Sequence, residues 1–134
     1  MSVLVADASC LVAALVDEGE TGRWAEARLE SAAGELAAPE VVGAEVANIL
    51  RRAEHAGRIT AAAAAAAHDD LLTLDLVTLP YAPFARRIWE LRPNLTAYDA
   101  WYVAVAEALA APLATLDRRL SRASGPRCRF LLPG

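Results

Sequence analysis

A short apolar run that ends at a carboxylate occurs twice in this sequence, and it constrains the fold more than any other feature. The first run, Val3 to Ala6, stops at Asp7, and the second, Leu113 to Leu116, stops at Asp117. Runs of this kind are typical of strands that lie buried in a parallel sheet and are covered on both faces. After the first run, apolar residues recur with the 3.6-residue period of a helix. The pattern predicts a strand, an acid at its carboxyl end, a short turn and a helix.

The rest of the sequence alternates predicted strands and helices. Further strands are expected at 35–38, 76–79 and 129–132, and helices from Thr21, from Pro39 to about Gly57, from Thr60 to about Leu74, from Pro83 to Leu91, from Ala97 to about Leu109, and directly after Asp117. This alternation predicts an α/β fold, with a parallel sheet of about five strands between layers of helices. No linker or repeat divides the sequence, so we expect one domain over residues 1–134.

Composition excludes several classes of protein. The 134 residues carry a formal net charge of −4, and because the chain has no lysine, arginine supplies all of the formal positive charge. This balance argues against a protein coated in positive charge for nucleic acid, although a local basic patch stays possible. The most apolar stretch, 97–116, is interrupted by two acids and a proline, which argues against a membrane span. With no secretory signal visible and only Cys10 and Cys128, we expect a cytoplasmic protein with reduced thiols.

Glu45 is the most informative acid in the predicted helix that begins near Pro39. On a helical wheel it lies in an apolar stripe formed by Val41, Val42 and Ile49. A carboxylate in such a stripe is costly to bury unless it is paired, liganded or lining a cavity. The alternative is that this face borders solvent. Asn48 shares roughly the same face and is expected to orient Glu45 by hydrogen bonding.

The remaining acids have structural and functional interpretations that the sequence leaves open. Asp7 alone is explained well as an N-cap of the following helix. Asp99 lies three residues after Thr96, which is the spacing of a capping box, yet this position also directs it toward the strand ends. If the strands ending at Asp7 and Asp117 are neighbours, their carboxylates converge. Thr115 points to the same face as Asp117 and is able to donate a hydrogen bond there.

Taken together, these side chains predict a site for a divalent cation. The acids are Asp7, Glu45, Asp99 and Asp117, and the possible supporting donors are Ser9, Asn48 and Thr115. Like charges at close range repel and raise one another's pKa, and a divalent cation relieves that repulsion. An all-oxygen ligand set suits Mg²⁺ or Mn²⁺, whereas zinc prefers cysteine or histidine.

The order and spacing of these motifs resemble those of PIN domains, and in particular the VapC-type toxins of bacterial and archaeal toxin–antitoxin pairs. The resemblance covers essentially the whole chain. Four segments carry it: Asp7 with Ser9 after the first strand, the Glu-x-x-Asn segment from Pro39 to Leu50, the segment from Leu95 to Ala106 around Asp99, and the Thr-x-Asp end of Leu113 to Asp117.

This resemblance implies a metal-dependent endoribonuclease built on a PIN-like three-layer α/β/α fold. The resemblance implies that Mg²⁺, for which Mn²⁺ can substitute, is held by Asp7, Glu45 and Asp99. It also implies that Asp117 is a fourth ligand or a supporting group. Ser9 and Thr115 would support these acids. Phosphodiester hydrolysis by a metal-activated water needs no protein nucleophile. The implied partners are an RNA substrate and a VapB-type antitoxin, in a homodimer and a toxin–antitoxin hetero-oligomer.

The sequence adds its own expectations about these partners. Arg118, Arg119 and Arg122 directly follow Asp117 and are expected to contact RNA phosphates, unless they form a solvated helix face. Trp24, on an early charged helix, is expected near a partner groove, whereas Trp101 is expected in the core.

Rival enzyme classes with acids at strand ends fit less well. Receiver domains and haloacid-dehalogenase-like phosphatases rely on a lysine, and P-loop NTPases require both a lysine and a glycine-rich loop. The chain has no lysine. The alternative that stays open is a catalytically inert PIN-like scaffold that acts as a protein-binding module.

Overall fold

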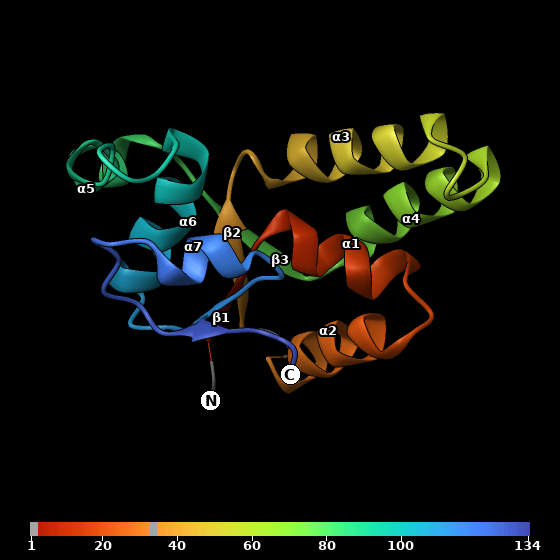
Figure 1. Ribbon diagram of the computed structural model, residues 1–134, viewed down its shortest axis with the longest axis horizontal. Coiled ribbons are helices and arrows are strands. Elements are labelled where there is room, and N and C mark those ends of the chain that lie inside the picture. The colour runs from red at the N-terminus through yellow and green to blue at the C-terminus, as the bar shows by residue number, and fades with distance from the viewer. Residues whose placement is uncertain (1–2, 33–34) are drawn as a thin grey trace.

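A computed structural model describes residues 3–32 and 35–134, and a parallel five-stranded sheet lies at its centre (Figure 1). The strand order is β3-β2-β1-β4-β5, and every pairing is parallel. The strands are β1 (Leu4–Ala6), β2 (Leu36–Pro39), β3 (Leu76–Leu79), β4 (Leu113–Ala114) and β5 (Phe130–Leu131). Because β1 pairs directly with β4, the ends of the two acid-terminated runs are neighbours, which confirms the predicted α/β class.

Helices occupy both sides of this sheet. In Figure 1, α1 to α4 lie on one side and α5 and α6 on the other. The helical elements are α1 (Ala8–Val16), α2 (Glu20–Ser31), α3 (Val42–His55), α4 (Ala61–Thr73), the 3₁₀ turn η1 (Ala82–Phe84), α5 (Ala85–Glu90), α6 (Ala97–Ala108) and α7 (Arg118–Arg122). This arrangement is the expected three-layer α/β/α fold. Within the described residues, no helix is long and apolar enough to cross a membrane.

Side-chain caps fix where several of these helices begin. Thr60 accepts a hydrogen bond from the backbone of Ala63 at the start of α4, and Thr96 accepts one from Asp99 at the start of α6. Both starts agree with the sequence prediction. A cap satisfies a backbone N–H group that the helix itself leaves without a partner. The cap at Thr96 therefore fixes the position of Asp99, in the first turn of α6.

The prediction that Pro39 opens the third helix is wrong. Pro39 is the last residue of β2, where it lies opposite Leu79 of β3, and α3 starts only at Val42. The next residue, Glu40, donates its backbone N–H to Leu79. Since donors alternate along a strand, Pro39 would present its missing N–H toward β1, which has already ended at Ala6. A proline is therefore tolerated at this point of a central strand.

The core between the layers is formed by small and branched apolar side chains. Val5, Leu11, Val46, Val103 and Leu113 are fully or almost fully buried. Alanine is frequent among the other core residues, and it lets helices approach the sheet closely. The apolar faces of β1 and β4 and of helices α1, α3 and α6 thus hold the carboxyl ends of the central strands in fixed positions.

The three tryptophans differ in how far they are exposed. Trp24 and Trp101 are half-buried and pack against the core, whereas Trp89 on α5 is 64% exposed. The expectation for Trp101 agrees with the structure. Trp89 is the most exposed of the three, and a partner groove near Trp24 stays a prediction. Cys10 is buried, Cys128 is half-buried, and both are free thiols.

Candidate active site

All four acids predicted from the sequence line a single cavity beyond the carboxyl ends of β1 and β4. The cavity has a volume of about 600 Å³. It is lined by Asp7, Glu45, Asp99 and Asp117, with Ser9 and Asn48 beside them. Asp7 follows β1, Asp117 follows β4, Glu45 projects from α3, and Asp99 lies in the first turn of α6. Segments that are far apart in sequence therefore contribute to one acidic site, at the edge where ligands bind in open α/β sheets.

Asp7 is held by three hydrogen bonds. Its Oδ1 accepts a bond of 2.6 Å from the Ser9 hydroxyl and one of 3.0 Å from the backbone N–H of Cys10, and its Oδ2 accepts one from the Thr115 hydroxyl. The residue is only 9% exposed. Burial raises its pKa, the bonds from Ser9, Thr115 and Cys10 oppose that rise, and repulsion from Asp117 adds to it. The side chain caps α1 and faces the cavity at the same time.

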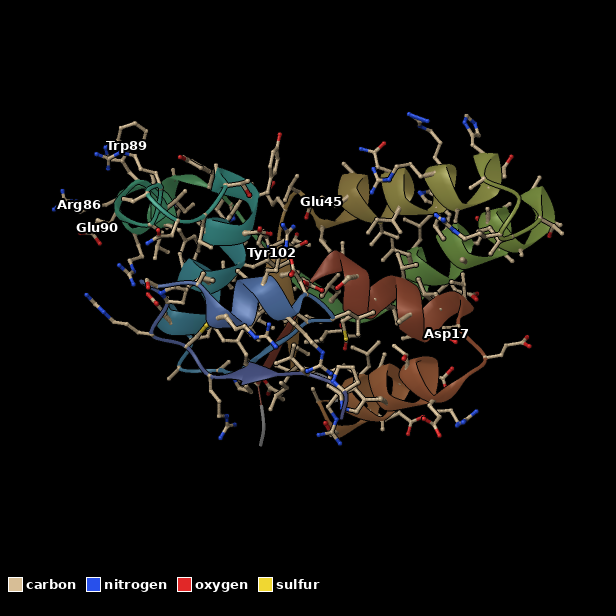
Figure 2. The ribbon with its side chains drawn as sticks, in the orientation of Figure 1. Asp17, Glu45, Arg86, Trp89, Glu90 and Tyr102 are labelled. Atoms are coloured by element: carbon tan, nitrogen blue, oxygen red, sulfur yellow. The ribbon has the colours of Figure 1, made fainter. Side chains whose placement is uncertain are left out.

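Glu45 is anchored by a residue that the sequence did not single out. The Tyr102 hydroxyl of α6 donates a 2.7 Å hydrogen bond to Glu45 Oε1. Figure 2 shows the two side chains meeting between α3 and α6. Asn48 lines the same cavity, but the hydrogen bond expected from it comes from Tyr102 instead. Tyr102 is 2% exposed, so this bond is shielded from water.

The charge on Glu45 is costly in this environment. Burial raises its pKa, the hydrogen bond from Tyr102 opposes the rise, and the carboxylates of Asp99 and Asp7 add to it. The pKa of Asp99 is likewise raised by burial and then by Asp117 and Asp7, while Thr96 and Arg119 oppose the rise. The acids are thus close enough to disfavour each other's ionised form.

Thr115 links two of these acids. Its hydroxyl donates to Asp7 and accepts a 3.0 Å hydrogen bond from the backbone N–H of Asp117. Asp117 in turn caps α7, because its Oδ1 accepts from the backbone of Arg119 and Leu120 at 2.9 and 3.2 Å. Thr115 is completely buried. The ends of β1 and β4 are therefore tied together by side chains as well as by the sheet.

The donor set of the cavity suits a hard divalent cation. Every acidic group facing it offers oxygen, and positive charge would relieve the repulsion that raises the pKa of Asp7, Glu45 and Asp99. Among the residues that the structure describes, no three acidic, histidine or cysteine side chains stand close enough to form a compact ligand cluster. The oxygen donors lining the cavity therefore fit Mg²⁺ or Mn²⁺ in their chemistry, although they are not gathered into a compact cluster.

The predicted arginine cluster is divided among different surroundings. Arg118 Nη2 donates a 2.7 Å hydrogen bond to the backbone carbonyl of Pro133. Arg119 lines a second, smaller cavity, and Arg122 is exposed at the end of α7 and contributes to neither acidic cavity. The main cavity instead contains Arg52, which the sequence analysis did not select.

Comparison with known proteins identifies the family to which this fold and site belong. The family model described as "PIN domain" matches residues 4–126. Ribonuclease VapC9 of Mycobacterium tuberculosis strain H37Rv is 40% identical over 126 residues, covering 94% of each chain. Ribonuclease VapC1 of the same strain is 38% identical over 133 residues, covering 98% of each. Among solved structures, VapBC2 from Rickettsia felis, bound to a promoter DNA fragment, matches in fold with a TM-score of 0.71, at 17% identity over 97% of this chain and 98% of that one. The chain belongs to the PIN-domain family.

Proposed function

We propose that this protein is a metal-dependent endoribonuclease that hydrolyses RNA phosphodiester bonds with a metal-activated water. The observation that carries the proposal is the convergence of Asp7, Glu45, Asp99 and Asp117 on one cavity at the carboxyl ends of β1 and β4. Two relatives at 38–40% identity over nearly their whole length are named ribonucleases, which supports the same activity here. We assign the metal as Mg²⁺, with Mn²⁺ as a substitute, because the available ligands are oxygens.

The four acids share one part in the proposed mechanism. Asp7, Glu45, Asp99 and Asp117 would hold the cation. When bound, the cation lowers the pKa of a coordinated water and neutralises charge that develops on the phosphodiester. Ser9 and Thr115 keep Asp7 in one orientation.

The remaining contacts keep the other acids in place without supplying a nucleophile. Tyr102 holds Glu45 toward the cavity, and Thr115 fixes the backbone position of Asp117. Burial and the nearby Asp7 raise the pKa of the Cys10 thiol to about 12. This thiol stays protonated at neutral pH and is a poor nucleophile, so hydrolysis by water is the consistent chemistry.

We further propose that the nuclease is the toxin of a VapBC-type pair, with a VapB-type antitoxin as partner and a homodimer within a hetero-oligomeric complex. The support is that the relatives carry the name VapC. Large apolar side chains are also exposed on the described surface, among them Leu72, Val77 and Trp89. Such side chains are candidates for burial by a partner.

The experiment that tests the activity measures cleavage of single-stranded RNA with Mg²⁺, with Mn²⁺ and with excess EDTA. We expect cleavage only with metal, and Asp7→Asn should reduce the rate by more than ~100-fold, because loss of a group that merely orients a ligand costs only about 10–100-fold. The control is Asp69→Asn, an exposed acid on α4. Thermal melting must show that both variants fold.

The same experiment separates the nuclease from the inert scaffold. Metal binding without cleavage of any RNA would favour a protein-binding module. Full cleavage in EDTA, or equal rates for the Asp7 and Asp69 variants, would reject the metal mechanism.

A further inference from the structure

We infer that a single RNA strand crosses the acidic site from end to end, with one phosphate held by Arg52, another by Arg119, and a base stacked on Tyr98. This inference rests on the proposed ribonuclease function and adds to it how the substrate strand lies. It assigns substrate contacts to side chains from three helices, α3, α6 and α7.

The path follows from two cavities that share a wall. The main cavity of about 600 Å³ and a second one of about 270 Å³ are both lined by Asp99 and Asp117. Arg52 lines the first cavity and Arg119 lines the second. Asp99 and Asp117 therefore lie where the two cavities adjoin, with Arg52 in the first and Arg119 in the second, and we call the two adjoining cavities the depression.

Arg52 extends the acidic face of α3. Glu45, Ile49 and Arg52 are spaced four and three residues apart, so they lie along one side of the helix, and all three line the main cavity. At 1.5 Å per residue, Arg52 lies roughly 10 Å beyond Glu45 along the helix axis. Its neighbour Arg51 lines a different cavity, on the side of α3 that faces α4. The helix thus directs one of two adjacent arginines into the site.

Arg119 lines the second cavity together with Asp99 and Asp117. The side chain is exposed, and its backbone N–H is already bonded to Asp117. Its guanidinium is therefore presented at the rim of the second cavity. An arginine there suits a phosphate oxygen, because its planar fork can donate two hydrogen bonds.

Tyr98 supplies an aromatic surface next to the acids. It precedes Asp99 on α6, lines the main cavity and is 57% exposed. An aromatic ring that faces solvent beside a cleft of this kind suits an unpaired RNA base, which stacks on aromatic side chains. A base held inside a duplex would not be free to stack there. The site therefore favours a single strand, a loop or an end.

The charge pattern distinguishes RNA from a basic peptide as the occupant. A basic peptide lying along the depression would meet Arg52 at one end and Arg119 at the other, and both would repel it. An RNA strand has the complementary pattern when a cation sits among the central acids, because its flanking phosphates meet the arginines. The order of arginine, acids and arginine along the depression thus favours RNA, whose central phosphate would contact the cation and whose flanking phosphates would contact the arginines.

The test measures how binding of RNA depends on salt. The probe is a fluorescent single-stranded RNA of about 12 nucleotides and random sequence, a length in the range of known single-strand sites. Binding is measured by anisotropy with Mg²⁺ in an Asp99→Asn background, which blocks cleavage. Each lost phosphate contact should make the negative slope of log affinity against log salt less steep by ~0.7. We therefore expect a change of ~0.7 for Arg52→Ala and for Arg119→Ala, and of ~1.4 for the double variant.

Matched variants control for general charge and for folding. Arg51→Ala removes an adjacent charge that faces another cavity and should leave the slope unchanged. Tyr98→Ala should weaken binding about tenfold at an unchanged slope, as expected for loss of base stacking, whereas Tyr98→Phe should retain binding.

Several results would overturn the inference. Equal slopes for the Arg51 and Arg52 variants would do so, as would an unchanged slope for Arg119→Ala. Tighter binding of an arginine-rich peptide by the Arg52 and Arg119 variants, without an effect on RNA, would assign the depression to a basic peptide. Normal metal-dependent cleavage with unchanged slopes would reject only this path, whereas absence of both RNA cleavage and RNA binding would reject the proposed function as well.

Discussion

Replacement of Tyr102 by Phe tests whether Glu45 must be anchored for the site to bind metal. The substitution keeps the ring, which is almost fully buried, and removes only the hydroxyl that donates to Glu45 at 2.7 Å. A hydrogen bond to a charged group contributes about 1.5–3 kcal/mol. Glu45 also faces the cavity, where water can replace part of the lost bond. We therefore expect a loss of ~1.5 kcal/mol in stability, or about 5 °C in Tm.

The effect on metal binding follows from the direction of the pKa shift. The bond from Tyr102 holds the pKa of Glu45 down, against burial and repulsion from Asp99 and Asp7. Its removal raises that pKa further, so the proton competes with the metal up to a higher pH. Mn²⁺ affinity of Tyr102→Phe should fall most at acidic pH and approach that of the wild type as pH rises.

The assay is calorimetric titration with Mn²⁺ at a series of pH values, with Tyr98→Phe as the matched control. Tyr98 lies one helical turn earlier on α6, lines the same cavity and makes no hydrogen bond to Glu45 among the described residues. An affinity profile that moves equally in both variants, or in neither, would refute the anchoring role. A stability loss without a change in the profile would mean that the bond only packs α6 against α3.

Two further predictions concern charge and partners. In the absence of metal, Asp99→Asn should raise the Tm at neutral pH, because the raised pKa of Asp99 marks a charge that destabilises the fold. Calorimetry should show this gain shrink as pH falls through the raised pKa and vanish below the unfolded value of ~3.9, where the wild-type group is protonated in both states. The protein encoded by the neighbouring gene should copurify with this chain and inhibit cleavage. A chain that cells tolerate on overexpression, without any effect of the neighbour, would contradict the toxin proposal.

Much of the fold could be predicted because its signals are local. The runs before Asp7 and Asp117 are short, apolar and end at acids, and the caps at Thr60 and Thr96 follow directly from residue type and spacing. Convergence of Asp7 and Asp117 followed from parallel pairing of the two strands. The prediction that a helix begins at Pro39 was wrong because proline suits both the first turn of a helix and the end of a strand. Proline is tolerated in β2 because β1 ends early, and this pairing is not visible in the sequence.

The contacts that could not be predicted depend on how helices are rotated against each other. Tyr102 lies 57 residues from Glu45, and their bond requires particular faces of α3 and α6 to meet. One signal was present: Tyr102 follows Asp99 by three residues, so the two share a helix face. In α7, successive residues turn by about 100°, which sends Arg118 toward Pro133 and Arg119 toward the acids. Arginines that are adjacent in the sequence therefore make contacts in different places.

Asp7 can cap a helix and also bind a cation, because its two carboxylate oxygens make different contacts. In the structure its Oδ1 receives the Ser9 hydroxyl and the Cys10 N–H, and its Oδ2 receives Thr115. Asparagine keeps an Oδ1 that can accept the first two bonds, and its amide N–H₂ can donate to the Thr115 oxygen. The helix cap therefore survives Asp7→Asn, while the charge that would hold the cation is lost. A folded, inactive variant is the expected outcome, and an unfolded one would show that the negative charge itself maintains the junction of β1, α1 and β4.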